Sequence, residues 1–238
     1  MLHHIKLLSL AFCFMFSTIV SAQDALPKRI QANYEVTKNG QPFATVKEQF
    51  VVSGNTYKIE SITKGLGVYA LFGERKLTST GEVTAEGLKP THFELLQGDN
   101  AKKALITDFD WPKNTLHMRV KGSVKDAALT AGTQDLASYA YQFMFFPAPM
   151  KDAITVNLTT GKKLNQYQYK INAEQQMLEV AGTQYKILHL VPPEQNKPQT
   201  ETKELWLSVD HHFVPVRIMM IDENGQKLEQ TLTELHVE

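Results

Sequence analysis

Few side chains in this 238-residue sequence have the types and spacing that catalysis requires. Asp108 and Asp110 lie two residues apart and would share one face of a strand, and paired carboxylates can serve acid–base chemistry when burial raises a pKa. A turn beginning at Trp111 is expected to keep both carboxylates solvated. Ser138 lacks the G-x-S-x-G turn of a serine hydrolase, so we expect its hydroxyl to bond to the local backbone.

Metal binding has one weak candidate, the adjacent pair His211 and His212, which follows Asp210. Neighbouring residues of a strand point to opposite faces, so the two imidazoles could share an ion only in a turn. Zinc sites usually draw on better-spaced ligands, and the only cysteine, Cys13, lies in an N-terminal apolar run. We therefore expect a solvated turn, with no metal, no cofactor and no disulfide.

The first 22 residues are typical of a secretory signal peptide. A short basic start is followed by an apolar run over Leu7–Val20 and by a cleavage motif that ends at Ala22. The run is too short for a comfortable membrane span, and a polar segment follows it. The sequence therefore predicts cleavage after Ala22 and a periplasmic product, residues 23–238, that does not span the membrane.

We expect residues 23–238 to form a single β domain. The whole sequence has 25 basic and 25 acidic residues without a basic tract, which argues against nucleic acid as a partner. Apolar and polar residues alternate from Arg29 onward, and Asn39-Gly40 and Asn224-Gly225 are typical of hairpin turns. Because short turns join antiparallel strands, the pattern predicts an antiparallel meander.

The meander is expected to curve. Its predicted strands lie at 32–36, 44–52, 57–61, 77–83, 93–96, 104–111, 116–120, 154–158, 167–171, 178–180, 185–191, 205–209, 214–221 and 228–237. One short helix is expected over Asp135–Met144, where apolar residues recur at helical spacing. A flat open sheet of this size would be unusual and would expose its edges, so we predict an all-β fold: a single antiparallel meander curved into a half-open barrel, with the helix against its concave face.

Several short motifs resemble, in their order and spacing, the DUF3108 family of uncharacterised exported bacterial proteins. The resemblance extends from about Ala32 to Leu235. The motifs are Tyr34 followed by Asn39-Gly40, the segment Gly65–Gly73, Ser79-Thr80-Gly81 followed by Gly87-Leu88-Lys89-Pro90, Asp135-Leu136-Ala137-Ser138, and Glu204-Leu205-Trp206-Leu207 with Pro215-Val216-Arg217. The family implies an exported protein of this fold, and it brings no established activity, substrate or cofactor.

Two apolar pieces stand out from the strand pattern: the glycine-framed residues 65–73, and the residues that follow the expected helix, Phe143, Phe145, Phe146 and Met150. In a closed core such residues fill the interior, whereas in an open half-barrel they would line its mouth as a binding surface. Under the second interpretation the candidate ligand-binding residues are Leu66, Tyr69, Phe72, Phe143, Phe146 and Trp206. Arg217 is the candidate polar anchor for a head group, or else it pairs with a carboxylate such as Glu204.

Three functions remain open, and the leading hypothesis is a non-enzymatic periplasmic protein that carries or senses an apolar or amphipathic ligand, such as a small molecule or lipid. A curved meander has an apolar concave face that one short helix fills poorly, which favours a cavity. The alternative is a structural or protein-interaction module of the cell envelope, with an envelope protein as its partner. An envelope hydrolase ranks last, because only Asp108, Asp110, Ser138 and His211 would be available for catalysis.

Overall fold

The computed structural model describes residues 26–98, 104–146, 153–193 and 201–238, so the predicted signal peptide lies outside the described residues. The strands are β1 Arg29–Lys38, β2 Gln41–Ser53, β3 Thr56–Gly65, β4 Arg75–Thr84, β5 Gly87–Gln97, β6 Leu105–Asp110, β7 Thr115–Val120, β8 Ser123–Ala128, β9 Gln134–Asp135, β10 Ala153–Thr159, β11 Leu164–Val180, β12 Thr183–Val191, β13 Thr202–Ser208, β14 Val214–Ile221 and β15 Lys227–Val237. Within the described residues, three short 3-10 helices accompany them: η1 Gly67–Phe72, η3 Tyr141–Phe145 and η4 Val209–His211.

All the described strands belong to one sheet, in the order β8-β7-β6-β5-β4-β3-β2-β1-β15-β14-β13-β12-β11-β10-β9. Neighbouring strands are antiparallel, except that β9 runs parallel to β10. The first and last strands pair with each other in the middle of the sheet, from Ile30 opposite Val237 to Lys38 opposite Leu228. The predicted antiparallel meander is confirmed.

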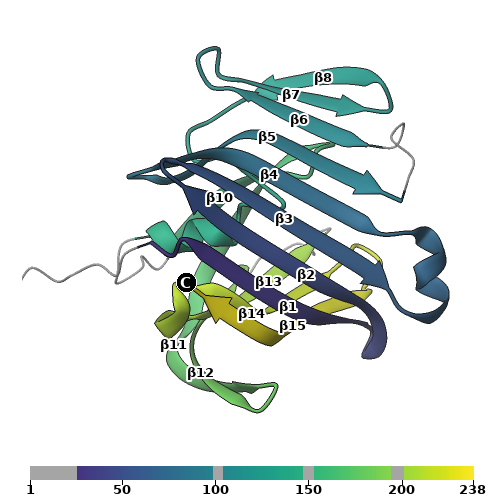
Figure 1. The fold of residues 1–238 in the computed structure, drawn as a ribbon, viewed down its shortest axis with the longest axis vertical. Coiled ribbons are helices and arrows are strands. Elements are labelled where there is room, and N and C mark those ends of the chain that lie inside the picture. The colour runs from purple at the N-terminus through teal and green to yellow at the C-terminus, as the bar shows by residue number, and fades with distance from the viewer. Residues whose placement is uncertain (1–25, 99–103, 147–152, 194–200) are drawn as a thin grey trace, which may run out of the picture.

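The connection between the two edges of the sheet requires strong curvature. Residues 129–133 link β8, at one edge, to β9, at the other. So few residues span at most about 20 Å, whereas fifteen strands spaced about 4.8 Å apart would make a flat sheet more than about 60 Å wide. Figure 1 shows the result: β1–β8 form one wall and β10–β14 lie behind it. The sheet does not close into a barrel, as the half-open prediction requires.

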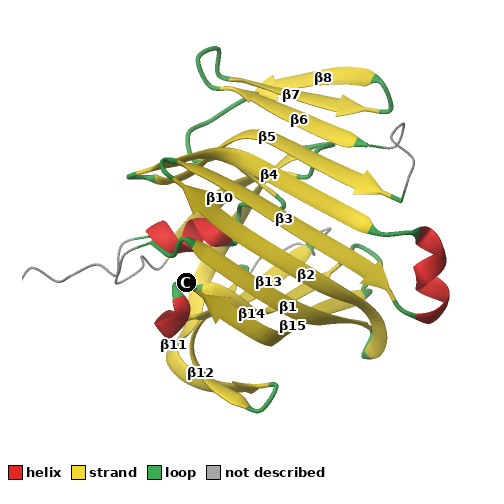
Figure 2. Cartoon of the chain, in the orientation of Figure 1, coloured by secondary structure: helices red, strands yellow, loops and turns green. Residues whose placement is uncertain are grey.

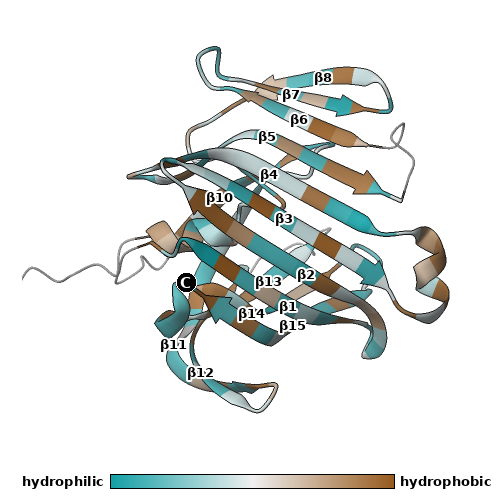
Figure 3. Cartoon of the chain, viewed as in Figure 1, coloured by the Kyte–Doolittle hydropathy of each residue, from teal (hydrophilic) through white to brown (hydrophobic). Residues whose placement is uncertain are grey.

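Strand alternation produces the core. Along the strands, hydrophobic and hydrophilic residues follow one another (Figure 3), because successive side chains point to opposite faces of the sheet. The inward-facing residues of the first wall pack together, among them Ile30, Phe50, Ile59, Phe93 and Leu116, all fully buried. The concave face therefore holds the apolar core.

Turn chemistry sets the register of the hairpins. Asn39 and Gly40 both have positive φ, 50° and 79°, which is the type I′ geometry expected of Asn-Gly between strands. The Asn39 side chain also accepts a hydrogen bond from the backbone of Lys227, 2.8 Å away, and so holds the neighbouring hairpin. The predicted turn at 222–226 is present as well, closed by hydrogen bonds between Asp222 and Gln226.

Three strands differ from the sequence prediction. β9 Gln134–Asp135 lies at the start of the segment for which the sequence predicts a helix. β8 was not expected, because its residues are almost all exposed and lack apolar alternation. The predicted strands at 167–171 and 178–180 are parts of one long strand, β11. Its pairing with β12 shifts at Asn172 and Gln175, and each bulge resets the alternation that sequence reasoning follows.

The return segment, residues 129–146, packs on the concave face and carries the short helix. Only the second half of the expected range is helical, as η3 Tyr141–Phe145, while residues 136–140 form turns. The Asp135 carboxylate accepts the backbone N–H groups of Ala137 and Ser138, and the Ser138 hydroxyl accepts that of Asp135, which favours a capped turn over a regular helix. Figure 2 shows η3 beside the sheet and η1 projecting from the ends of β3 and β4.

Candidate functional site

A cavity of about 360 Å³ lies between the two walls of the sheet and the return segment. Strands β1–β4 and β13–β15 form its sides, and turn residues of the return segment form its floor. Its lining residues are Val36, Phe43, Val46, Glu48, Ser61, Thr63, Arg75, Leu77, Leu136, Ala137, Tyr139, Ala140, Lys203, Ile218, Met220, Leu228 and Gln230. Most of these side chains are apolar, and the polar ones come from strands on both walls.

Cross-strand register brings the polar side chains of the first wall together. Val46, Thr63 and Arg75 lie opposite one another on β2, β3 and β4, and so do Glu48, Ser61 and Leu77 in the next inward-facing row. Each row holds one apolar residue and two polar ones. The first wall therefore supplies most polar groups of a cavity whose remaining lining is mainly apolar, as small-molecule sites commonly are.

Glu48 provides the acidic group of the cavity. The Tyr141 hydroxyl donates a 2.8 Å hydrogen bond to the Glu48 carboxylate, which joins the wall to η3. Burial raises the pKa of Glu48, and the hydrogen bonds from Tyr141 and Ser61 act in the opposite direction. The carboxyl group is therefore held between the β2 wall and the return segment.

Lys203 provides a basic group on the opposite wall. Its side chain is only 6% exposed, and its ammonium group lies 3.3 Å from a Glu201 oxygen. The same ammonium lies over the rings of Tyr167 and Tyr139, at 4.7 and 5.6 Å from their centroids. Burial lowers the pKa of Lys203, while the Glu201 carboxylate raises it. This cation is fixed by its partners.

The floor of the cavity is anchored to the sheet by a buried hydrogen-bond network. The Ser79 hydroxyl donates a 2.6 Å hydrogen bond to the Asp135 carboxylate, and the Tyr57 hydroxyl lies 3.0 Å from Ser79. Burial raises the pKa of Asp135 to about 6. Every polar atom of this carboxyl group contacts a structural partner, so the network positions the return segment.

Two glutamines complete that anchor. The Gln142 side chain accepts the backbone N–H of Leu88 at 2.8 Å and donates to the Glu86 carbonyl at 2.9 Å, and Gln134 donates to the Leu88 carbonyl at 2.8 Å. They bind the hairpin between β4 and β5, at Gly87, whose φ of 121° a side chain would rarely adopt. The return segment is thus held along its length.

The three candidate ligand-binding residues near η1 do not line this cavity. Phe72 is 69% exposed, and Leu66 is also exposed. Tyr69 packs on Phe43, a lining residue, with 4.6 Å between the ring centroids. The closed-core interpretation is therefore wrong for η1, because Val68 and Leu71 are 71% and 88% exposed.

The other four candidates also lie outside the lining. Phe143 is fully buried and contacts Phe146 edge to face, so both support the return segment. Trp206 stacks on His189, and the Arg217 guanidinium lies 5.7 Å from the centre of the Trp206 ring. Arg217 pairs with Glu229 at 3.7 Å, whereas Glu204 contacts His189. A role in ligand binding for these residues remains a prediction.

Sequence reasoning missed the charged residues of the cavity, Glu48, Arg75 and Lys203. A signal for them exists in the alternation, since Glu48 occupies an inward position between Val46 and Phe50, where an apolar residue is expected. A charged residue at an inward position of a strand is rarely buried without a partner. A charged residue at an inward position of a strand is therefore as useful an indication of a binding site as an exposed aromatic residue.

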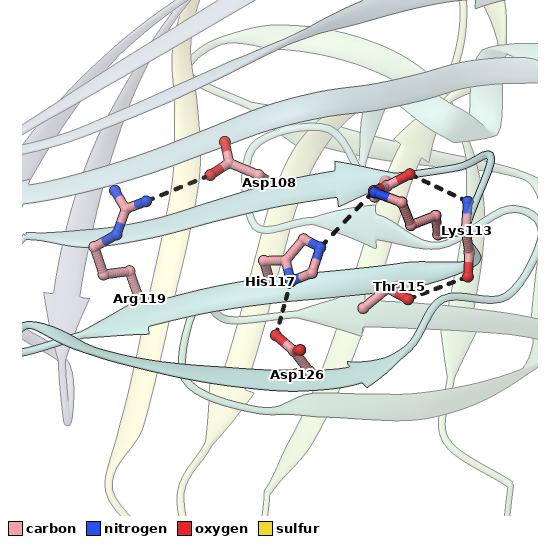
Figure 4. A network of polar contacts seen from close by, with 7 residues as sticks. Asp108, Lys113, Thr115, His117, Arg119 and Asp126 are labelled. Carbon is pink, nitrogen blue, oxygen red and sulfur yellow. Dashed lines mark hydrogen bonds and ion pairs between the residues drawn. The ribbon is translucent and has the colours of Figure 1, made fainter.

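The four candidate catalytic residues are not brought together. Asp108 and Asp110 share the outer face of β6, as predicted, and Asp108 contacts His92 at 2.7 Å. Asp108 also contacts Arg119 at 3.9 Å (Figure 4). A hydrogen bond from Lys113 lowers the pKa of Asp110, which is the wrong direction for a general acid.

Ser138 and His211 are separate from that surface and from each other. The Ser138 hydroxyl accepts the Asp135 backbone N–H, as predicted, and His211 lies 2.8 Å from the Ser208 hydroxyl in the η4 turn. Within the described part of the chain, no cluster of three or more His, Cys, Asp or Glu residues could hold a metal ion. Of the helices described, none is long and apolar enough to cross a membrane.

Comparison with known proteins gives a family and a fold. A sequence model described as "Protein of unknown function (DUF3108)" matches residues 32–233. The chain is also similar to the crystal structure of a beta-barrel-like protein of domain of unknown function DUF1849 from Brucella abortus, with a TM-score of 0.57 and 11% identity over 88% of this chain and 98% of that one. At that identity the likeness concerns the fold alone. Curated proteins give no match.

Proposed function

We propose that this chain, which belongs to the DUF3108 family, is a periplasmic, non-enzymatic binding protein that carries or senses an apolar or amphipathic envelope ligand. The cavity carries the proposal. Its volume of about 360 Å³ falls within the range of roughly 300–1,000 Å³ that small-molecule pockets occupy. Val46, Leu77, Ile218 and Met220 give it an apolar wall from both sides of the sheet.

The polar groups of the cavity support binding over catalysis. Glu48 is bonded to Tyr141 and Lys203 is paired with Glu201, so each is held by a structural partner. No serine, threonine or lysine among the described lining residues is hydrogen-bonded to a histidine that could activate it. A hydrolase of envelope material therefore has weaker support.

This function is tested by identifying the molecules that co-purify with the protein. Native mass spectrometry and organic extraction of the purified exported protein should reveal a co-purifying apolar molecule, and the emptied protein should bind a fluorescent fatty-acid probe. Ile218→Trp fills the cavity from β14 and should weaken probe binding at least tenfold.

Val124→Trp is the matched control, since Val124 is 59% exposed on β8, away from the cavity. It should leave probe affinity unchanged, and urea unfolding of both variants checks that each one folds. If the protein is empty and binds no probe, or if Ile218→Trp binds as well as the unmodified chain, the carrier function is refuted.

A second candidate function, a protein-interaction module, is favoured by η1. Val68, Leu71 and Phe72 expose apolar side chains at the tip that projects from the sheet (Figure 2). Exposed apolar patches on a soluble domain often mark contact sites. The edge strands are less favourable contact sites for a partner, since β8 carries exposed Lys125 and Asp126 and β9 is buried.

Substitution of the η1 tip separates the two functions. A chain carrying Leu71→Ser and Phe72→Ser should lose an envelope partner in pull-down experiments if η1 is the contact site. Bound ligand and probe affinity should be unchanged in this variant if the cavity binds the ligand by itself. Loss of the ligand without loss of a partner would assign η1 to ligand uptake.

A further inference from the structure

Arg75 lies where two pockets of the concave side meet. It lines the apolar cavity, and it also lines a second pocket of about 510 Å³ that is more open to solvent. Leu136, on the return segment, is the other residue common to both pockets. A molecule that extends from one pocket into the other would therefore pass the Arg75 guanidinium.

The second pocket is positively charged. Lys121 and Lys162 line it together with Arg75, and none of its described lining residues is acidic. No described carboxylate lies within ion-pair distance of any of these three cations. The two pockets thus differ in character, one apolar and the other cationic.

Arg75 is the charged group of the cavity that lacks a partner. Glu48 has Tyr141 and Lys203 has Glu201, but no described side chain accepts a hydrogen bond from the Arg75 guanidinium. Its burial disfavours the charged form and lowers its pKa, and the charges of Arg75 and Lys203 repel each other. The guanidinium is half-buried and has no partner among the described residues, so an anion bound here would stabilise the site.

We propose that the ligand of the cavity is an amphiphile with an anionic head group, a carboxylate or a phosphate, which binds Arg75 while its apolar chain occupies the cavity. This inference rests on the proposed function, because it names the ligand class of the same cavity. A guanidinium presents two parallel donors to either anion, and Lys121 and Lys162 add positive charge on the solvent side.

The test compares dodecanoate with dodecanol, which share an apolar chain and differ in charge. Displacement of a fluorescent probe from the full exported chain should give about ten- to a hundredfold tighter binding of dodecanoate, as expected of a hydrogen-bonded charge pair. Arg75→Met should remove most of that difference and leave dodecanol binding unchanged. Arg119→Met removes the same charge from the outer face, where Arg119 pairs with Asp108, and should change neither affinity.

A salt titration of the unmodified chain tests the same point without a substitution. Raising ionic strength should weaken the binding of dodecanoate and leave that of dodecanol unchanged. Arg75→Lys keeps the charge and should keep part of the preference, so the inference stays testable if Arg75→Met fails to fold. Inorganic phosphate should not displace dodecanoate at matched concentration. If it does, the site binds a free anion, and the proposal of an amphiphilic ligand is refuted.

The outcomes separate the two proposals. Equal affinity for dodecanoate and dodecanol, or a preference that survives Arg75→Met, overturns the anionic head group and leaves the carrier function standing. If neither compound binds and the purified protein is empty, the carrier function itself fails.

Discussion

The Ser79 hydroxyl lies 2.6 Å from the Asp135 carboxylate, and this hydrogen bond joins residues 56 positions apart in the chain. Ser79 is fully buried on β4, and Asp135 is fully buried on β9, at the far edge of the sheet. The bond therefore holds the return segment on the first wall. It also places the turn residues Ala137 and Tyr139 at the cavity floor.

The raised pKa of Asp135, about 6 against 3.8, predicts a pH-dependent stability. The folded protein binds the carboxyl proton of Asp135 more tightly than the unfolded chain does. The stability that this proton contributes is therefore fully present below pH 3.8 and is lost as the pH rises through about 6. A shift of two pKa units corresponds to roughly 3 kcal/mol. Asp135→Asn keeps an oxygen that accepts the Ala137 and Ser138 N–H groups and removes the titration.

Urea unfolding of both proteins between pH 4 and pH 7 checks this prediction. Relative to Asp135→Asn, the unmodified protein should lose stability as the pH rises. Comparison of the two proteins cancels the contribution of Glu48, whose pKa is also raised. A difference that stays constant across this range would contradict the prediction.

Gln142→Ala should lower the free energy of unfolding by about 1–3 kcal/mol, because it leaves the buried Leu88 N–H without an acceptor. The control is Gln184→Ala, which removes an exposed hydrogen bond to Glu179 and should change the free energy by less than about 0.5 kcal/mol. Urea unfolding at pH 7 measures both. Equal effects of the two substitutions would show that the anchor at Leu88 contributes little.

Gly40→Ala should destabilise the protein by about 1–2 kcal/mol, because an L-residue is strained in the left-handed region. Gly40 has φ of 79° and open space around its Cα, so the effect would come from the backbone alone. Gln41→Ala, at the exposed neighbouring position, should have almost no effect. Thermal unfolding is a sufficient measurement, and an unchanged midpoint for Gly40→Ala would refute the type I′ requirement.

Cleavage after Ala22 predicts that N-terminal sequencing of the protein from a periplasmic extract will begin at Gln23. Replacement of Leu8 and Leu10 by Asp should abolish export, because a signal peptide needs its apolar run. The replacement Lys28→Ala, beyond the cleavage site, should export normally. An intact Met1, or recovery of the protein from the cytoplasm alone, would contradict the prediction.

Most of the fold could be predicted because alternation and turn chemistry are local. Tyr34 and Val46 fall at inward positions that their own neighbours indicate, and Asn39-Gly40 favours its turn whatever surrounds it. β8 could not be predicted, since its residues are exposed on both faces. The sequence predicts the helix at the right place in the chain, but the first half of the predicted range forms turns, because Asp135 and Ser138 bond to the local backbone.

Residue alternation along each strand is enough to predict an antiparallel meander that has to curve, since inward and outward positions follow from it. Which inward positions meet at the cavity depends on how the strands are arranged in space. Arg75 and Lys203 come from strands on opposite walls, and their proximity depends on the curvature of the whole sheet and on the return segment between its edges. Curvature is a sum over many strand pairs, so no local pattern encodes it.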